Sequence, residues 1–297
     1  MCVTMFKAIW SLFALLPLIA LSDGYELEDD APGQPAALGE YPFVASIQRI
    51  VEYQDYYDDD ENGTIFHYRH QCAGTILNDK FILTTKEALK SMFDGGARLR
   101  VVAGSLTTSE NSSTSTQQIR NVANVFFNAT MHATLVEVDE AFQFGPEVAA
   151  VVVARAGDSG IFHESQTCFS VGWNLHIRQD HKPRLLRWIN VTPITNDECS
   201  SLLKERTVDG DLPVDLLKPI ICGGIKYGGQ LTPQCFDTHG PLICKGNDGS
   251  MKLFGMSGNP VACDPAKRVV DAYMSVVPLL DWIHKIAGTI KYSSEDV

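Results

Sequence analysis

The sequence has no cluster of Lys and Arg, although 24 of its 297 residues are basic, and its formal net charge is −12. Because neutralising a phosphate backbone requires clustered basic side chains, we expect no nucleic-acid partner. Beyond residue 22, no run approaches the roughly 18 apolar residues that a membrane span needs, so no span is predicted there. The cysteines and histidines show no zinc-ligand spacing. We therefore expect neither a metal nor another cofactor.

Residues 1–22 have the pattern of a secretory signal peptide. Lys7 precedes an apolar run that ends near the small residues Ala20 and Ser22. An N-terminal membrane anchor is the alternative, but the run is short and no basic flank follows it. We expect a secreted, extracellular protein. Residues 23–38, which are acidic and rich in Pro, Gly and Ala, are predicted to form an extended N-terminal segment.

Two further features agree with a secretory route. Four Asn-X-Ser/Thr triplets are candidate N-glycosylation sites: Asn62, Asn111, Asn128 and Asn190. One of the eight cysteines lies in the signal peptide, which leaves seven: Cys72, Cys168, Cys199, Cys222, Cys235, Cys244 and Cys263. In an oxidising compartment they indicate a disulfide framework, and the odd number leaves one thiol without an intramolecular partner.

Short runs of β-branched and aromatic residues alternate with Gly, Pro, Asn and Asp along most of the chain. They predict strands over residues 43–48, 74–84, 99–102, 122–127, 135–138, 148–154, 168–173, 185–191, 220–223, 241–245, 253–256 and 272–276. So many short strands indicate an all-β barrel or sandwich. Two helices are also predicted, one over 195–203 with acidic residues in its first turn, and one over 278–287 with an apolar stripe.

Residues 51–68 form an unusual loop in which acidic residues surround Tyr53, Tyr56 and Tyr57. The simplest interpretation is a solvated hairpin loop that is extended by repulsion between its like charges. Two alternatives remain open. Acidic residues beside exposed tyrosines suit tyrosine sulfation in a secreted protein. Oxygen-rich side chains suit calcium, although the spacing matches no EF-hand loop.

Several motifs follow one another in a recognisable order. They occupy residues 39–43 (Gly-Glu-Tyr-Pro-Phe), 70–77 (His-Gln-Cys-Ala-Gly-Thr-Ile-Leu), 167–173 (Thr-Cys-Phe-Ser-Val-Gly-Trp), 191–199, 222–224 (Cys-Gly-Gly), 240–244 (Gly-Pro-Leu-Ile-Cys) and 280–283 (Leu-Asp-Trp-Ile). Together they resemble the trypsin/chymotrypsin-type serine protease domain over nearly all of residues 30–288. The resemblance implies an all-β fold of two six-stranded antiparallel β-barrels packed together, with a C-terminal α-helix. We expect this domain over residues 39–288 and a C-terminal tail over 289–297.

The resemblance also implies a disulfide pattern of Cys168–Cys244, Cys199–Cys222 and Cys235–Cys263. Each such bridge typically contributes about 2–4 kcal/mol to stability. Cys72 is left unpaired, because its usual partner directly follows the catalytic histidine, and that position is Ala88. Cys72 is then either a small buried thiol or the site of a disulfide-linked dimer.

The family's catalytic positions carry different side chains. The mechanism needs a hydroxyl nucleophile beside an imidazole base, with a carboxylate behind the imidazole. Here the histidine position is Glu87 and the aspartate position is His132. A one-residue deletion places Thr238 at the serine position, or His239 if the gap is moved. The barrels would then place Glu87 beside Thr238 and His132 behind Glu87, so the base beside the hydroxyl is a carboxylate, which is a poor acceptor for its proton.

Three other features of the family are altered. Phe236 replaces the glycine that supplies an oxyanion-hole N–H, and losing one such donor costs about 10²–10³ in rate. No Lys or Arg lies between residues 7 and 49, so the usual activating cut after a basic residue is excluded. The base of the specificity pocket, at residues 232–234, holds no acid that would pair with a substrate Lys or Arg. The pocket positions are degenerate: Pro233, Asn259 and Asp271.

These observations predict a secreted, glycosylated serine protease homologue without peptidase activity, which acts through its surface on an extracellular protein partner. One alternative is a hydrolase that uses a rearranged set of Glu87, His132 and Thr238, and another is a decoy for protease inhibitors. Non-catalytic homologues of this family are known as immune-cascade cofactors and as components of male reproductive secretions. Because residues 23–71 contain no six-cysteine clip module, a reproductive (seminal) fluid is favoured over an immune-cascade role.

Overall fold

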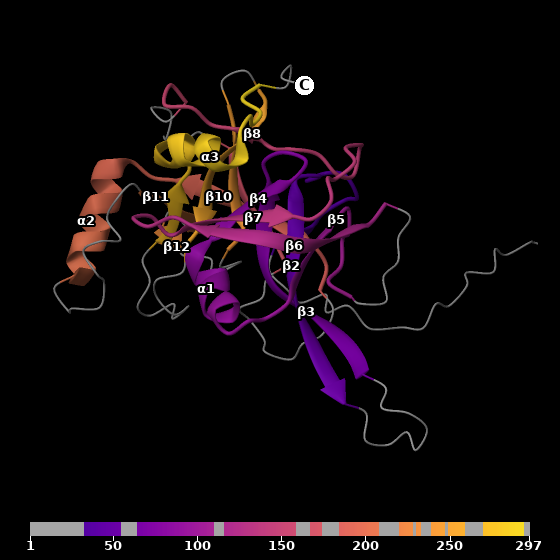
Figure 1. Ribbon diagram of the computed structural model, residues 1–297. Helices are drawn as coiled ribbons and strands as arrows, with labels where there is room; N and C mark the ends of the chain where they lie inside the picture. Colours follow the sequence, from indigo (N-terminus) through magenta and orange to yellow (C-terminus); the bar gives the residue numbers. More distant parts are fainter. Residues whose placement is uncertain are drawn as a thin grey trace, which may run out of the picture.

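The computed structural model describes residues 33–54, 64–109, 116–158, 167–173, 184–207, 220–227, 230–232, 239–246, 249–258 and 270–293. Strands dominate this part of the chain and form two sheets (Figure 1). Across those ranges, each helix is too short or too polar to span a bilayer. The predicted signal peptide at 1–22 lies outside the described residues.

The first sheet is a closed barrel of six strands. In ring order they are β2 (Val44–Gln54), β3 (Thr64–Ile76), β4 (Phe81–Thr85), β7 (Ala133–Val138), β6 (Gln118–Phe127) and β5 (Leu99–Ala103), and each neighbouring pair is antiparallel. Successive residues of a strand point to opposite faces, so every second side chain enters the barrel. Ile47, Val101 and Val136 are fully buried in this interior.

The second sheet closes in the same way. Its ring consists of β10 (Arg187–Pro193), β9 (Cys168–Gly172), β13 (Pro241–Lys245), β14 (Met251–Ser257), β15 (Asp271–Ser275) and β11 (Ile220–Tyr227), which pairs back with β10. Three short strands join it: β1 (Gln34–Pro35), β8 (Val152–Val153) and β12 (Gln230–Thr232). The predicted fold of two six-stranded antiparallel barrels with a C-terminal helix is confirmed.

One apolar cluster is shared by the two barrels. It joins Leu83 and Leu135 of the first barrel to Val171, Trp173 and Ile243 of the second, all of them fully buried. Burying a large aliphatic side chain contributes about 1.5–3 kcal/mol. This shared core therefore fixes how the barrels sit against each other.

The C-terminal helix forms where the sequence predicts it. A 3₁₀ turn, η3 (Val277–Leu279), leads into α3 (Leu280–Ala287), and Ile283 packs in the shared core. The side chain of Asn78, from the first barrel, donates hydrogen bonds to the carbonyls of Ala287 (2.9 Å) and Thr289 (3.2 Å). The helix is thus tied to the first barrel although it follows the second in sequence.

The N-terminal end of the described chain is anchored to the second barrel. Strand β1 pairs with β10 through Gln34–Trp188 and Pro35–Arg187. The buried guanidinium group of Arg187 donates two hydrogen bonds to the carbonyl of Gly33, at 3.3 and 2.9 Å. Residues 33–35 therefore belong to the second barrel, while β2, which follows them, begins the first.

Two local strand predictions are wrong. Residues 74–84 are not one strand, because the chain turns between β3 and β4. Asn78 Oδ1 accepts hydrogen bonds from the backbone N–H groups of Lys80 and Phe81, which is a turn that Asn favours. Residues 148–154 form a strand only at β8, because the N–H groups of Ala149 and Val151 bond to carbonyls of the first barrel and its entry loop.

Helix α1 (Lys86–Asp94) is absent from the sequence-based prediction. It directly follows β4 and buries Ala88 and Leu89 against the first barrel, with Met92 partly buried one turn later. This spacing is helical, but the segment is short and most of its other residues are polar. The second helix, α2 (Asn196–Thr207), begins where the sequence predicts and runs further than the predicted 195–203.

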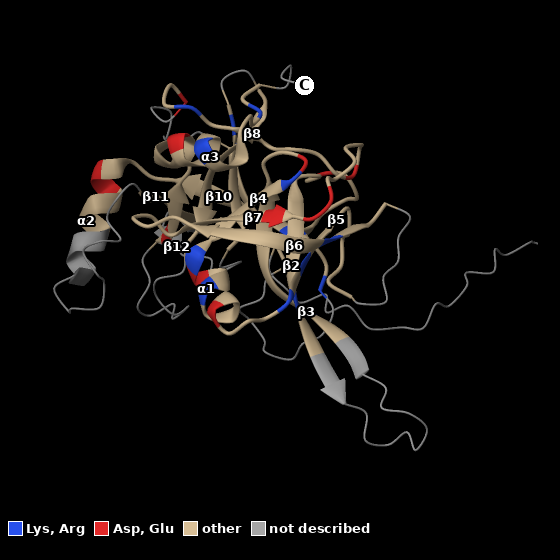
Figure 2. Ribbon diagram, in the orientation of Figure 1, with Lys and Arg blue, Asp and Glu red and all other residues tan. Residues whose placement is uncertain are grey.

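Strands β2 and β3 continue past the first barrel as a two-stranded ribbon. The pairing of β2 with β5 ends at Arg49, whereas β2 and β3 remain paired as far as Gln54 and Thr64. Figure 1 shows this ribbon projecting away from the body of the protein. Arg49 and Arg69 lie directly opposite each other at its base, where Figure 2 shows basic residues. The acidic, Tyr-rich tip predicted within 51–68 lies largely outside the described residues.

A buried polar network extends from the first barrel to the shared core. His70 packs edge-on against Trp173, with ring centroids 5.1 Å apart, and its Nδ1 lies 2.6 Å from Ser46 Oγ. Gln48 Nε2 donates to Ser46 Oγ at 3.2 Å, and Arg100 Nε donates to Gln48 Oε1 at 2.8 Å. Buried polar groups with partners of this kind specify one arrangement of the strands that carry them.

Burial, together with the nearby charges of Arg184 and His239, lowers the pKa of His70 to about 3. The imidazole is therefore neutral in the folded protein at physiological pH. The ordinary value is 6.5, so the unfolded chain binds a proton that the folded chain excludes.

We expect the free energy of unfolding to fall as the pH drops from about 6.5 towards 3, with His70 contributing a slope of up to about 1.4 kcal/mol per pH unit. Above that window the contribution is constant. Urea unfolding of wild type and His70→Asn between pH 7.5 and 4 measures it. Asn can still hydrogen-bond Ser46 but does not titrate, so the difference between the two proteins should shrink on acidification. Parallel curves would contradict the role of His70.

Candidate functional site

Glu87 and His132 lie side by side where β4 and β7 end. Thr85 pairs with Ala133 across these strands, and the N–H of Lys86 donates to the carbonyl of His132 at 2.9 Å. The first turn of α1 then brings Glu87 Oε1 into hydrogen-bond contact with His132 Nδ1. The side chains are 38% and 45% exposed, respectively, so the pair faces solvent. The contact is the one expected from the sequence.

A second imidazole comes from the other barrel. His239 stands just before β13, and its Nδ1 lies 2.5 Å from the hydroxyl oxygen of Thr85. Thr85 is fully buried at the end of β4, a strand of the first barrel. The hydrogen bond therefore bridges the two barrels, two residues before Glu87 in the sequence. Sequence reasoning missed the bridge, because it treated His239 only as an alternative match to the serine position.

The remaining predicted site residues are only partly described. Thr238 and Phe236 lie outside the described residues, as do the pocket positions Pro233 and Asn259. Asp271 is described: it begins β15, is 4% exposed and lies opposite Gly223 of β11. A carboxylate is therefore buried at this end of the second barrel.

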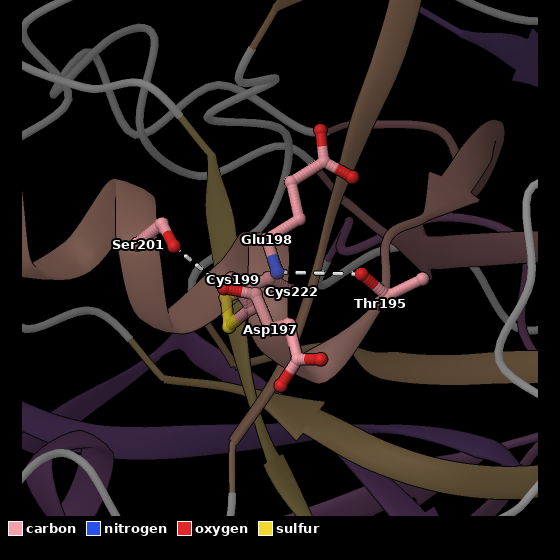
Figure 3. Close-up of a disulfide and its surroundings, with 6 residues drawn as sticks. All are labelled: Thr195, Asp197, Glu198, Cys199, Ser201 and Cys222. Atoms are coloured by element: carbon pink, nitrogen blue, oxygen red, sulfur yellow. Dashed lines mark hydrogen bonds between the residues drawn. A yellow bond between two sulfur atoms is a disulfide. The ribbon is translucent and has the colours of Figure 1, made fainter.

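Two of the three expected disulfides are present. Cys168–Cys244 joins β9 to β13, and Cys199–Cys222 joins α2 to β11. Cys235 and Cys263 lie outside the described residues. Figure 3 shows the second bridge beside the start of α2, where the hydroxyl oxygen of Thr195 accepts a hydrogen bond from the N–H of Glu198 at 3.3 Å. The predicted helix start is thus capped and held to the barrel covalently.

Cys72 lies inside the first barrel. Its side chain is fully buried, and the hydroxyl of Thr84 lies 3.7 Å from its sulfur as a hydrogen-bond donor. Ile47 and Ile82 belong to the same cluster. This burial agrees with the first of the two alternatives for Cys72, a small buried thiol.

The two imidazoles of this site already have hydrogen-bond partners. The Nδ1 atoms of His132 and His239 are engaged by Glu87 and Thr85, respectively. Within the described ranges, no three His, Cys, Asp or Glu side chains gather as metal ligands would. The site therefore offers an exposed carboxylate–imidazole pair and a part-buried hydroxyl–imidazole pair.

We expect Thr85→Val to lower the free energy of unfolding by about 1–3 kcal/mol, because it leaves Nδ1 of the partly buried His239 without the Thr85 hydroxyl. The matched control is Thr134→Val on the adjacent strand. In the described part of the chain, the buried Thr134 hydroxyl oxygen has no hydrogen-bond partner, so its removal should be neutral or stabilising. Urea unfolding of both variants measures the difference, and equal effects would contradict the bridge.

Comparison with known proteins places this arrangement in context. A family model described as Trypsin matches residues 31–283. The chain is 24% identical over 241 residues to "Serine proteinase stubble" of Drosophila melanogaster, an alignment that covers 79% of this chain and 28% of that protein. It is also 24% identical over 264 residues to "Transmembrane protease serine 9" of Rattus norvegicus, covering 86% of this chain and 22% of that protein.

A relative of similar size is also found. "Serine protease 28" of Mus musculus is 22% identical over 265 residues, which are 85% of this chain and 87% of that protein. By contrast, the chain spans only about a quarter of the length of the first two relatives. The match to the family covers both barrels and the start of α3, and the two barrels have the topology that the motifs predict. The chain belongs to the trypsin family.

Proposed function

We propose that this protein is a non-catalytic member of the trypsin family, which acts by binding rather than by peptide hydrolysis. The observation that carries the proposal is the contact between Glu87 and His132. The family's mechanism needs an imidazole between the nucleophile and the carboxylate. At the matching positions of this chain, the two groups are exchanged.

The exchange has a direct chemical consequence. A base at the position of Glu87 is a carboxylate, which accepts a hydroxyl proton far less readily than an imidazole. His132 is hydrogen-bonded to Glu87 through its Nδ1 atom. The other nearby imidazole, His239, is hydrogen-bonded to Thr85, whose own hydroxyl is fully buried and out of reach of a substrate. These contacts support the loss of peptidase activity independently of the Phe236 substitution.

We expect the purified protein to resist labelling by fluorophosphonate probes and to leave chromogenic peptide substrates uncleaved. An active trypsin-family protease in the same buffer is the positive control. Thr238→Ala is the matched variant, and it should behave as wild type does. Labelling that maps to Thr238 and disappears in this variant would overturn the proposal.

The same variant tests the alternative function, a hydrolase built on a rearranged set of Glu87, His132 and Thr238. The Glu87–His132 contact favours this set over an arrangement of separated groups. If Thr238→Ala abolishes a measured hydrolytic activity, the rearranged set is the active site.

We further propose that the protein is secreted and glycosylated and works in an extracellular fluid. The signal-peptide pattern of residues 1–22, the sequons and the two disulfides support this setting. A reproductive (seminal) fluid is favoured over an immune-cascade cofactor role, because residues 23–71 lack a clip module. Association through a Cys72 disulfide is disfavoured, since its sulfur is buried in the first barrel.

The partner-binding surface that we propose is the β2–β3 ribbon. It projects from the body of the protein, and partners commonly engage loops that a rigid scaffold presents. In sequence, acidic residues are concentrated within 52–61, whereas the described Arg49 faces Arg69 at the base of the ribbon. Tyrosine sulfation at Tyr53, Tyr56 or Tyr57 would add to the negative charge.

We expect neutralisation of the acidic tip (Asp58→Asn, Asp59→Asn, Asp60→Asn and Glu61→Gln) to weaken partner capture without changing the melting temperature by more than about 1–2 °C. Immobilised wild type and variant are compared on extract from the secreting tissue. Capture by wild type should also fall between low and high salt, as exposed charge pairs do. Equal capture by the two proteins would remove the tip from the interface.

A further inference from the structure

Strand β10 carries one of the four sequons in an unusual place. Its burial alternates strictly along Arg187–Pro193, and Asn190 is the exposed residue at its centre. Trp188 and Thr192 lie on the same face, because residues two apart on a strand point the same way. The exposed face of β10 therefore presents, in order, an indole, the sequon asparagine and the sequon threonine.

The neighbouring strand adds a second aromatic ring to this face. Phe169 of β9 lies directly opposite Asn190 in the antiparallel register. Its ring meets that of Trp188 edge-to-face, with centroids 5.2 Å apart, and both rings are only partly buried. Directly opposite side chains are about 4.5–5.5 Å apart at Cβ, and residues two apart on a strand are separated by about 7 Å. One sugar ring attached to Asn190 spans either distance.

The sequon at Asn128 has the opposite environment. Asn128 is 8% exposed, and its Oδ1 accepts hydrogen bonds from the N–H groups of Thr130 (2.9 Å) and Met131 (2.8 Å) and from the Thr130 hydroxyl (3.2 Å). This side chain closes the turn between β6 and β7. A glycan on Asn128 would have no open path from this buried side chain to solvent. The structure therefore distinguishes two sequons that look alike in the sequence.

We propose that Asn190 carries an N-linked glycan whose first N-acetylglucosamine packs on the Trp188–Phe169 pair, and that Asn128 stays unmodified. In the transfer, Nδ2 of Asn190 loses a proton and bonds to C1 of the sugar, and the lipid diphosphate of the donor oligosaccharide leaves with the bonding electron pair. The apolar face of the pyranose then covers aromatic surface that is otherwise partly exposed to water. The inference goes beyond the binding role and rests on the secretory route.

Tryptic peptides separate the two sequons. Cleavage after Arg187 and Lys204 isolates Asn190, and cleavage after Arg120 and Arg155 isolates Asn128. The full-length chain is expressed in a eukaryotic cell line and collected from the medium, and an amidase that converts a glycosylated Asn to Asp marks the occupied sites by mass. We expect the mark at Asn190 and not at Asn128. An unmodified Asn190, or an occupied Asn128, would overturn the assignment.

Thermal unfolding tests the packing. In an Asn62→Gln, Asn111→Gln background, complete removal of the glycan should lower the melting temperature by about 2–4 °C, the shift typical of one modest contact in a domain of this size. Trimming to the first sugar should leave the melting temperature unchanged. The variant Asn190→Gln should match the fully deglycosylated protein.

The role of the aromatic pair is tested by the shift in melting temperature that deglycosylation causes within each variant. Because each variant is compared with its own deglycosylated form, the effect of the substitution on the fold cancels. In Trp188→Thr, removing the glycan should shift the melting temperature by less than about 1 °C. Phe169→Thr serves in the same way if the first variant folds poorly. A shift as large as that of the parent protein in either variant would show that the sugar does not pack on these rings.

Discussion

The apolar core shared by the two barrels is the constraint on which the rest of this structure depends. Each barrel is closed by pairing among its own six strands. What holds them in one orientation is the burial of Leu83, Val171, Trp173 and their neighbours. Because that orientation is fixed, His239 of the second barrel meets Thr85 of the first.

The residues that stabilise the fold and the polar residues of the candidate site form separate groups in this structure. The residues that build the barrels form a close-packed core, two disulfides and a docked C-terminal helix. The Thr85 hydroxyl and the His239 imidazole pair across the interface, whereas Glu87 and His132 pair with each other on the exposed end of the first barrel.

The sequence was sufficient for the fold because its motifs fall on strands whose order determines the topology. It also predicted the Glu87–His132 contact, since the two residues lie just beyond the paired ends of β4 and β7, which are adjacent strands of the first barrel. The hydrogen bond between Thr85 and His239 could not be predicted from the sequence. The two residues are far apart in the chain and belong to different barrels, so their contact depends on how the barrels pack. The network around His70 was missed for the same reason: its Trp173 neighbour belongs to the other barrel. Helix α1 was missed because only Ala88, Leu89 and Met92 mark its buried side.

The two ends of the described chain give the molecule a property that neither barrel has alone. The first segment, held by Arg187, adds a strand to the second barrel, and the helix that follows the second barrel is held by Asn78 of the first. Each barrel is thus bound by a terminal segment, or arm, that is continuous in sequence with the other barrel. A single break in the backbone between the barrels would leave two interlocked pieces that separate only when an arm is released. After such a cut, the shared apolar core and both arms would still hold the two pieces together.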